Sequence, residues 1–182
     1  PAAGSEASPG SVVSRTDPPE KFFFNADIVR PRFAILNPEL TCTLPRYQTA
    51  AGATDIMSHI MERYFTLERD VDLTDHLCEG TLRTVIRNAP IALAEPENYA
   101  ARAEIMWAGT LAHNDLLSTG RVGDWSSHSI EHELSAQYDV THGAGLAVIY
   151  PAWMRHVMHR DPERFAQYAV RVWDVPFRAH DL

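Results

Sequence analysis

Apolar residues recur at helical spacing through most of the chain after residue 45. In residues 45–65 they form a stripe whose members are three or four positions apart, made of Ala53, Ile56, Met57, Ile60, Met61 and Tyr64. This spacing predicts an amphipathic helix, and Pro45 suits its first turn. Similar stripes and end signals predict further helices over 75–87, from Pro96 to near Gly120, over 124–137, over 143–157 and over 162–172.

The predicted helix over 143–157 differs from the others because it is apolar on nearly every side. We therefore expect it to be buried in the core. Pro151 lies inside it and lacks the N–H that continues a helical hydrogen-bond ladder. We expect a bend or an interruption at this proline.

The first 45 residues have a different pattern, in which Pro, Gly and Ser separate short runs. Two of these runs are SVVSRT (11–16) and FFF (22–24), and residues 30–45 are typical of a strand flanked by prolines. We expect strand and loop here, with too few strands for a sheet of its own. The chain begins at Pro1 without an initiator Met, which favours a piece of a longer protein.

The composition is that of an ordinary globular protein, with 182 residues of which 45% are hydrophobic and 22% charged. The formal net charge of −8 opposes non-specific binding to phosphate backbones, so we expect no nucleic-acid partner. No apolar run approaches the roughly 18 residues of a membrane span, and no charged segment followed by an apolar one starts the chain. We therefore expect no membrane association and a cytoplasmic location.

Cysteine does not supply a metal site in this sequence. Cys42 and Cys78 are the only two cysteines, and neither belongs to a CxxC pair. Any metal must therefore be held by histidine and carboxylate ligands.

Histidine and aspartate form a more specific pattern. Asp55 and His59 are four residues apart on the first predicted helix, so both project from one face. His128 and His132 repeat this spacing on the fourth, and His142 precedes the Gly-rich start of the fifth. Five candidate ligands thus lie on three segments that a helical bundle can bring together, which indicates a metal site. The remaining histidines lack such neighbours and are expected at the surface or as satisfied core residues: His76, His113, His156, His159 and His180.

Three stretches carry a further signal: TAAGATDIMSHIMERY, EPENYAARAEIMWAGTLAHNDLL and DWSSHSIEHELSAQYDVTHGAGLAVIYPAWM. With them the chain resembles the iron-dependent (group III) alcohol dehydrogenases over nearly its whole length. Within that family it is similar to the branch of NADPH-dependent butanol dehydrogenases and aldehyde reductases. The Asp-x3-His pair, the His-x3-His pair and the later His follow the family's order, with fourteen positions from His128 to His142.

The resemblance implies a mainly α fold, the helical metal-binding domain of the dehydroquinate synthase-like, iron alcohol dehydrogenase fold. A short β segment from a truncated α/β dinucleotide-binding domain would precede it. Residues 1–45 would then be the C-terminal edge of that domain, and residues 46–182 the truncated helical catalytic domain. The Gly-rich loop with which the family binds the cofactor pyrophosphate is absent from the sequence.

The resemblance also implies a ligand set. The family holds its metal with one Asp and three His, which match Asp55, His59, His128 and His142. These residue types accept Fe(II) and Zn(II) alike, so the identity of the ion stays open. His132 matches a histidine beside the metal and is the candidate for proton relay or substrate contact.

The segment PAAGSEAS resembles the end of the family's cofactor loop, which implies cofactor contacts by Gly4, Ser5 and Glu6. Ala3 replaces a Thr of the family's pattern and removes one hydroxyl contact. Lys21, the only lysine, matches a Lys near the nicotinamide ribose, although a solvated charge at a turn explains it equally well. The branch implies NADP, with NAD as the alternative.

The resemblance finally implies an oxidoreductase that transfers a hydride between NAD(P)H and a primary alcohol or aldehyde, such as butanol or butyraldehyde. A homo-oligomer, such as a homodimer, is expected. Two other functions fit the residues: a metal-dependent hydrolase or lyase, and a non-catalytic metal-binding helical module. A hydrolase needs a carboxylate base at the metal, but Glu131 and Glu133 point about 100° away from His132 on a helix.

Overall fold

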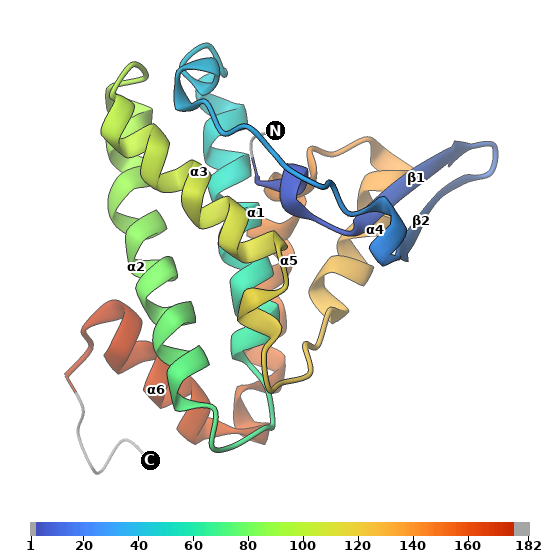
Figure 1. Ribbon diagram of the computed structural model, residues 1–182. Helices are drawn as coiled ribbons and strands as arrows, with labels where there is room; N and C mark the ends of the chain where they lie inside the picture. Colours follow the sequence, from blue (N-terminus) through green and yellow to red (C-terminus); the bar gives the residue numbers. More distant parts are fainter. Residues whose placement is uncertain (1–2, 177–182) are drawn as a thin grey trace.

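The computed structural model describes residues 3–176, and most of them are helical, as expected (Figure 1). The helices are α1 (Arg46–Tyr64), α2 (Asp72–Ala94), α3 (Tyr99–His113), α4 (Ser126–Tyr138), α5 (His142–Val157) and α6 (Pro162–Trp173). The strands are β1 (Gly10–Thr16) and β2 (Pro19–Asn25). The prediction of a mainly α fold is therefore confirmed.

Helix α1 is the centre of the bundle and packs against α2, α3 and α5. Its apolar stripe supplies Ile56, Ile60 and Tyr64, which are fully buried with Leu82 and Val85 of α2. The stripe predicted from the sequence is thus the contact surface of this helix, and burial of these side chains holds the bundle together.

Two of the predicted helices have wrong boundaries. Helix α2 begins before residue 75 and continues beyond 87 to Ala94. Helix α3 ends at His113 rather than near Gly120, because Asp115 adopts a left-handed backbone conformation with φ of 69°, which an α-helix cannot contain. A separate 3-10 turn, Leu116–Ser118, follows.

Helices α4 and α5 also differ from expectation. Helix α4 begins at Ser126, because Trp125 before it has a left-handed conformation; Asp124 accepts a hydrogen bond from the backbone N–H of Ser126 at 2.9 Å. Helix α5 continues through Pro151, which has no N–H to donate to the carbonyl of Ala147. Both residues are exposed, so water can hydrate that carbonyl. The expectation that α5 is buried all round is wrong, since Val148 is 70% exposed.

The N-terminal segment forms a two-stranded antiparallel hairpin, in which Val13 lies opposite Phe22. The expectation that this region has too few strands for a sheet of its own is therefore wrong. Residues 30–45, all of which are described, contain no strand, which corrects a second prediction. Pro31 and Pro38 interrupt the segment, and the side chain of Asn37 caps a 3-10 turn over Pro38–Thr41.

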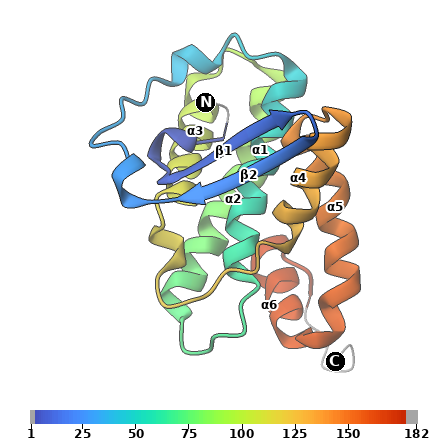
Figure 2. The same ribbon diagram turned by 90° about the vertical axis from the view of Figure 1, so that its right-hand side faces the viewer.

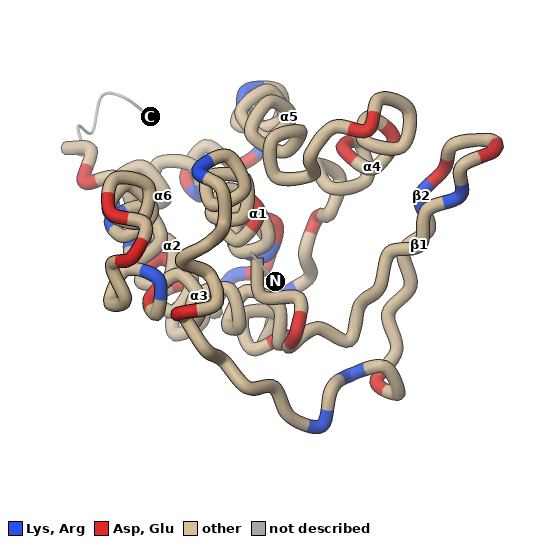
Figure 3. The backbone as a smooth tube through the Cα atoms, turned by 90° about the horizontal axis from the view of Figure 1, so that it is seen from above, with Lys and Arg blue, Asp and Glu red and all other residues tan. Residues whose placement is uncertain are grey.

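The hairpin crosses in front of α1 and lies beside α4 (Figure 2). From above, α4 is between α5 and the hairpin, while the chain after β2 swings away from the bundle before it returns to α1 (Figure 3). Residues of α1, α4, α5 and the hairpin line one cleft. None of the helices in residues 3–176 combines the length and apolar character needed to cross a bilayer.

Candidate metal centre

Asp55 and His59 of α1 project into this cleft from neighbouring turns. Nδ1 of His59 lies 3.1 Å from Oδ1 of Asp55, as the four-residue spacing predicts. Both side chains are about 15% exposed, so they border the core without filling it.

His128 reaches the same point from α4. Its Nε2 lies 3.7 Å from Oδ1 of Asp55 and 3.2 Å from Nδ1 of His59. Its Nδ1 donates a hydrogen bond to Oε1 of the fully buried Glu62 at 3.0 Å. This bond fixes the tautomer, so the lone pair of Nε2 faces Asp55 and His59.

His142 enters from the first residue of α5. Its Nε2 lies 3.6 Å from Oδ1 of Asp55, and its Nδ1 donates to the buried carboxylate of Glu131. Glu62 and Glu131 therefore act alike, each orienting one histidine. Neither role follows from the histidine and aspartate motifs alone. Glu62 lies seven residues after Asp55 on the same helix face, which is the signal that could have indicated its role.

The Gly-rich start of α5 has a steric explanation. A Cβ on Gly143 would lie 1.9 Å from the backbone oxygen of Ala51 in α1. Only glycine allows the two helices to approach this closely, and the approach brings His142 next to Asp55.

The four residues fit a divalent ion by their spacing. A tetrahedral ion with ligand bonds near 2.1 Å requires donor atoms roughly 3.4 Å apart. Oδ1 of Asp55 lies 3.1, 3.7 and 3.6 Å from the facing nitrogens of His59, His128 and His142, and His59 lies 3.2 Å from His128. Donor atoms of Asp55, His128 and His142 form one group within 4.8 Å of one another, and those of Asp55, His59 and His113 form a second. Oδ1 of Asp55 is buried and makes no hydrogen bond to any residue in 3–176. An unpaired buried carboxylate oxygen surrounded by imidazole nitrogens is the chemistry of a cation site.

Electrostatics within the cluster favours the ionised aspartate. Burial opposes ionisation of Asp55, but the attraction of His59, His128 and His142 outweighs it and holds the pKa of Asp55 well below its usual value. Burial likewise opposes protonation of His128, but Asp55 and Glu62 raise its pKa above the usual value. The cluster thus presents a negative oxygen at its centre.

His132 lies at the edge of this group. Its ring centroid is 5.2 Å from that of His142 and 6.5 Å from that of His128, and the side chain is half-buried. Burial, with the nearby His142 and His128, lowers the pKa of His132 to about 4. The ring is therefore neutral near pH 7 and can accept a proton.

His113 was expected at the surface or as a satisfied core residue, and it is a satisfied core residue that also contacts the candidate site. It is buried, and its ring stacks on that of His59 with centroids 3.9 Å apart. Its Nδ1 donates to the carbonyl of Gly109 at 3.0 Å, and burial lowers the pKa of His113 to about 3. Spacing along the chain could not reveal this contact, because α3 reaches α1 only by tertiary packing. His180 lies outside the described residues.

The cleft around these residues has a volume of about 680 Å³. The N-terminal segment forms one wall through Ser5, Ser8, Val12 and Phe23, opposite the histidines and Asp55. Four residues in the described chain are predicted to bind a cofactor, and only Ser5 among them lines this cleft.

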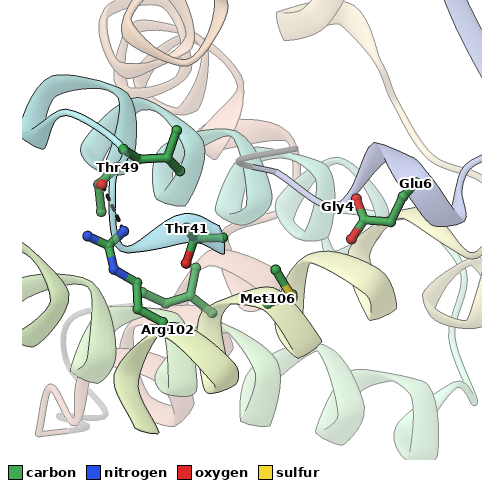
Figure 4. Close-up of a pocket in the computed structure, with 8 residues that line it drawn as sticks. Gly4, Glu6, Thr41, Thr49, Arg102 and Met106 are labelled. Carbon is green, nitrogen blue, oxygen red and sulfur yellow. Dashed lines mark hydrogen bonds between the residues drawn. The ribbon is translucent and has the colours of Figure 1, made fainter. Parts of the chain in front are cut away.

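Gly4 and Glu6 line a different, small cavity of about 20 Å³ against α3 (Figure 4). Arg102 closes that cavity and donates to Thr49 at 2.9 Å. Gly4 has φ of 93°, and a Cβ there would lie 2.2 Å from the backbone of Gly109, so its glycine is explained by packing. Lys21 of β2 donates to Oγ of Ser135 in α4 at 2.6 Å.

Comparison with known proteins identifies the family. Residues 49–179 match the model of the Fe-containing alcohol dehydrogenase family, C-terminal part. The chain therefore belongs to the Fe-containing alcohol dehydrogenase family, and the expectation from its motifs is confirmed.

Two relatives have dehydrogenase or reductase names. The chain is 45% identical over 174 residues to the probable NADH-dependent butanol dehydrogenase 1 of Bacillus subtilis, covering 96% of this chain and 45% of the relative. It is 41% identical over 175 residues to the NADPH-dependent aldehyde reductase YqhD of Escherichia coli, again covering 96% and 45%. The crystal structure of Escherichia coli K-12 YqhD superposes with a TM-score of 0.95 at 40% identity, covering 100% of this chain and 46% of that one. The chain thus spans under half the length of these proteins.

Proposed function

We propose that this chain supplies the metal-binding half of an oxidoreductase that transfers a hydride between NAD(P)H and a primary alcohol or aldehyde, such as butanol or butyraldehyde. The observation that carries the proposal is the convergence of Asp55, His59, His128 and His142 at 3.1 to 3.7 Å around the unpaired Oδ1 of Asp55. The names of the similar proteins support the same reaction.

We assign Asp55, His59, His128 and His142 as the residues that would hold the ion, Fe(II) or Zn(II). Such an ion supplies a Lewis acid that polarises the oxygen of the substrate. Glu62 and Glu131 accept from Nδ1 of His128 and of His142, which aims Nε2 of each ring at Asp55. They also hold the two imidazoles in place, which limits rearrangement when the substrate binds.

In this proposal His132 moves the proton. Reduction of an aldehyde adds a hydride from the cofactor to the carbonyl carbon and a proton to the oxygen, and oxidation of an alcohol reverses both steps. His132 lines the cleft next to His142 and is half-buried, so one side faces the substrate and the other can exchange with solvent. Replacing His132 by Ala should lower kcat while the metal content stays the same. A loss of metal in this variant would show that His132 is a ligand instead.

The nicotinamide cofactor would lie against the N-terminal wall of the cleft, where Ser5 is exposed to it. Residues 1–45 would then be the edge of the dinucleotide-binding domain and residues 46–182 the catalytic domain. NADP is our preference over NAD from the branch resemblance, and the relatives include both NADH- and NADPH-dependent proteins. Contacts of Gly4, Glu6 and Lys21 with the cofactor, a cytoplasmic location and a homodimer stay predictions.

The test is the consumption of NADPH and of NADH with butanal by the full natural polypeptide. We expect activity that a strong chelator abolishes and that added Fe(II) or Zn(II) restores. A matched control is the same protein with Asp55→Ala, which should show no recovery when metal is added. Stoichiometric metal without activity on either cofactor would contradict the proposal and favour a hydrolase or a structural metal site.

A further inference from the structure

Lys21, the only lysine of the chain, is bonded to helix α4 rather than exposed at a turn. It lies within β2, it is partly buried, and its Nζ donates to Oγ of Ser135 at 2.6 Å. A second hydrogen bond, from Nε2 of Gln137 to the carbonyl of Pro19 at 3.4 Å, joins the same strand to the same helix. The hairpin therefore lies beside α4 with Lys21 facing that helix (Figure 2).

The hydrogen bonds that start at Lys21 have a defined direction. A lysine ammonium group only donates, so Oγ of Ser135 accepts from it and keeps its own proton free to donate. Two acceptors lie within reach of that proton: Oε2 of Glu131 at 3.3 Å and the backbone carbonyl of His132 at 3.4 Å. The carboxylate is the stronger acceptor because it is charged. The chain of donors therefore runs from Lys21 through Ser135 to Glu131.

Glu131 connects this chain to the metal centre. It is fully buried, and its Oε2 also accepts from Nδ1 of His142. Its Oε1 makes no hydrogen bond to any residue in 3–176 and faces Gly145 of α5, where a Cβ would lie 2.5 Å from it. The orientation of the carboxylate thus depends on its two donors at Oε2, His142 and Ser135. A residue that fixes Ser135 therefore also helps to fix His142.

Lys21 does not itself face the metal centre. Among residues 3–176, the wall of the cleft includes Val12 and Phe23 of the hairpin but not Lys21. The positive charge of Lys21 lies two hydrogen bonds from the buried carboxylate of Glu131, and it offsets part of the cost of burying that group. The contacts of the lysine thus lead to the back of the metal centre.

We propose that Lys21 is a positioning residue for the metal centre. Through Ser135 and Glu131 it holds the imidazole of His142 in the orientation that binds the ion. The inference rests on the assignment of His142 as a ligand in the proposed function, and it adds the hairpin to the elements that build the site. A contact between Lys21 and the cofactor would instead change the KM of the cofactor and leave metal affinity unchanged.

The test is the affinity of the cofactor-free full polypeptide for Zn(II), measured by competition with a chromophoric chelator. Lys21→Met should weaken binding by roughly 3- to 10-fold, less than the roughly 10- to 100-fold that loss of a direct partner of a ligand costs. The sign is diagnostic, because removal of a positive charge near a cation site would by itself strengthen binding. Lys21→Arg keeps the charge and the donor and should restore most of the affinity. Arg15→Met removes an exposed charge from the same hairpin and is the matched control, which should bind Zn(II) like wild type.

A double-mutant cycle tests whether Lys21 acts through Ser135. Ser135→Ala should weaken binding by a similar factor, and Lys21→Met should have no further effect in that background, because the chain is already broken. The absorption spectrum of the Co(II)-substituted protein should change in the same way in both single variants. Unchanged or tighter binding in Lys21→Met, or two independent effects that multiply in the double variant, would overturn the inference.

Nuclear magnetic resonance of the metal-free protein separates failure of the inference from failure of the proposed function. The Nδ1 proton of His142 should exchange with water several-fold faster in Lys21→Met and in Ser135→Ala than in wild type, because its acceptor is less firmly held. This result would support the inference even if the full polypeptide transfers no hydride. Equal exchange in all three proteins would contradict the inference and leave the proposed function intact.

Discussion

Two buried polar clusters among residues 3–176 differ in how completely their carboxylates are paired. In the network around Asp75, Oδ1 accepts from Arg121 at 2.8 Å, and Oδ2 accepts from Arg164 and from Gln167 at 2.9 Å. In the metal centre, Oδ1 of Asp55 makes no hydrogen bond to any described residue and faces imidazole nitrogens instead.

The difference lies in the donor types. Guanidinium groups carry fixed charge and several N–H donors, so the Asp75 network is electrically complete and joins α2 to α6. Imidazoles that are tied to Glu62 and Glu131 through Nδ1 present lone pairs, so the other cluster is incomplete without a cation. The paired carboxylate of Asp75 therefore holds two helices together, while the unpaired oxygen of Asp55 among imidazole nitrogens indicates a cation site.

The largest expected effect is on stability, at the complete cluster. Asp75→Ala leaves Arg121 and Arg164 buried without their anion and should lower the free energy of unfolding by about 3–5 kcal/mol. Urea unfolding of wild type and variant measures this change. Metal bound per folded molecule should stay the same. A loss below about 1 kcal/mol would mean that the Asp75 network contributes little to the stability of the fold.

At the cluster around Asp55, the expected effect is a loss of metal affinity. Asp55→Ala removes one of four ligands and should weaken binding of Zn(II) by roughly 100- to 1000-fold, because each ligand supplies about a quarter of the total binding free energy. Competition with a chromophoric chelator measures the affinity. In the metal-free protein this variant should lose less stability than Asp75→Ala. Equal losses in the two variants would remove the distinction between the clusters.

Glu62 and Glu131, which accept hydrogen bonds from the histidines, test the comparison further. Glu62→Gln keeps the shape of the side chain but weakens its hold on His128, and metal affinity should fall by roughly 10- to 100-fold. Glu79→Gln is the matched control, since Glu79 accepts from Tyr64 at 2.8 Å in the Asp75 network. It should leave metal affinity unchanged. A drop in affinity for both variants would indicate a general loss of packing.

The smallest effect concerns pH. Burial opposes ionisation of Asp75, but Gln167, Arg164 and Arg121 outweigh it and hold its pKa below the usual value. A carboxylate whose pKa is lower in the folded state stabilises the protein above the unfolded-state pKa, which is about 3.9, and loses this contribution as pH falls through the folded-state value. The difference in unfolding free energy between wild type and Asp75→Asn should therefore shrink below about pH 4. A difference that stays constant with pH would contradict this.

Local periodicity was sufficient to predict the helices but not their ends. The stripe through Ile56, Ile60 and Tyr64 identified α1 because burial of one face produces that spacing. The end of α3 depends on the left-handed Asp115, whose φ of 69° accompanies contacts with Arg30 from a distant segment. The hairpin was missed because the two residues between β1 and β2, Asp17 and Pro18, are not one of the glycine-containing pairs that mark a two-residue hairpin turn.

The sequence alone determined the family and the residues offered to a metal, since the four-residue spacing on a helix aligns Asp55 with His59 and His128 with His132 whatever surrounds them. Tertiary structure decided which of these side chains meet. The close approach at Gly143 brings His142 to Asp55 and leaves His132 at the edge. It also decided the partners that no spacing encodes, since Glu131 and His113 gain their neighbours only when α1, α3, α4 and α5 pack together. Burial then strengthens those contacts, because water no longer screens the charges and lone pairs from one another.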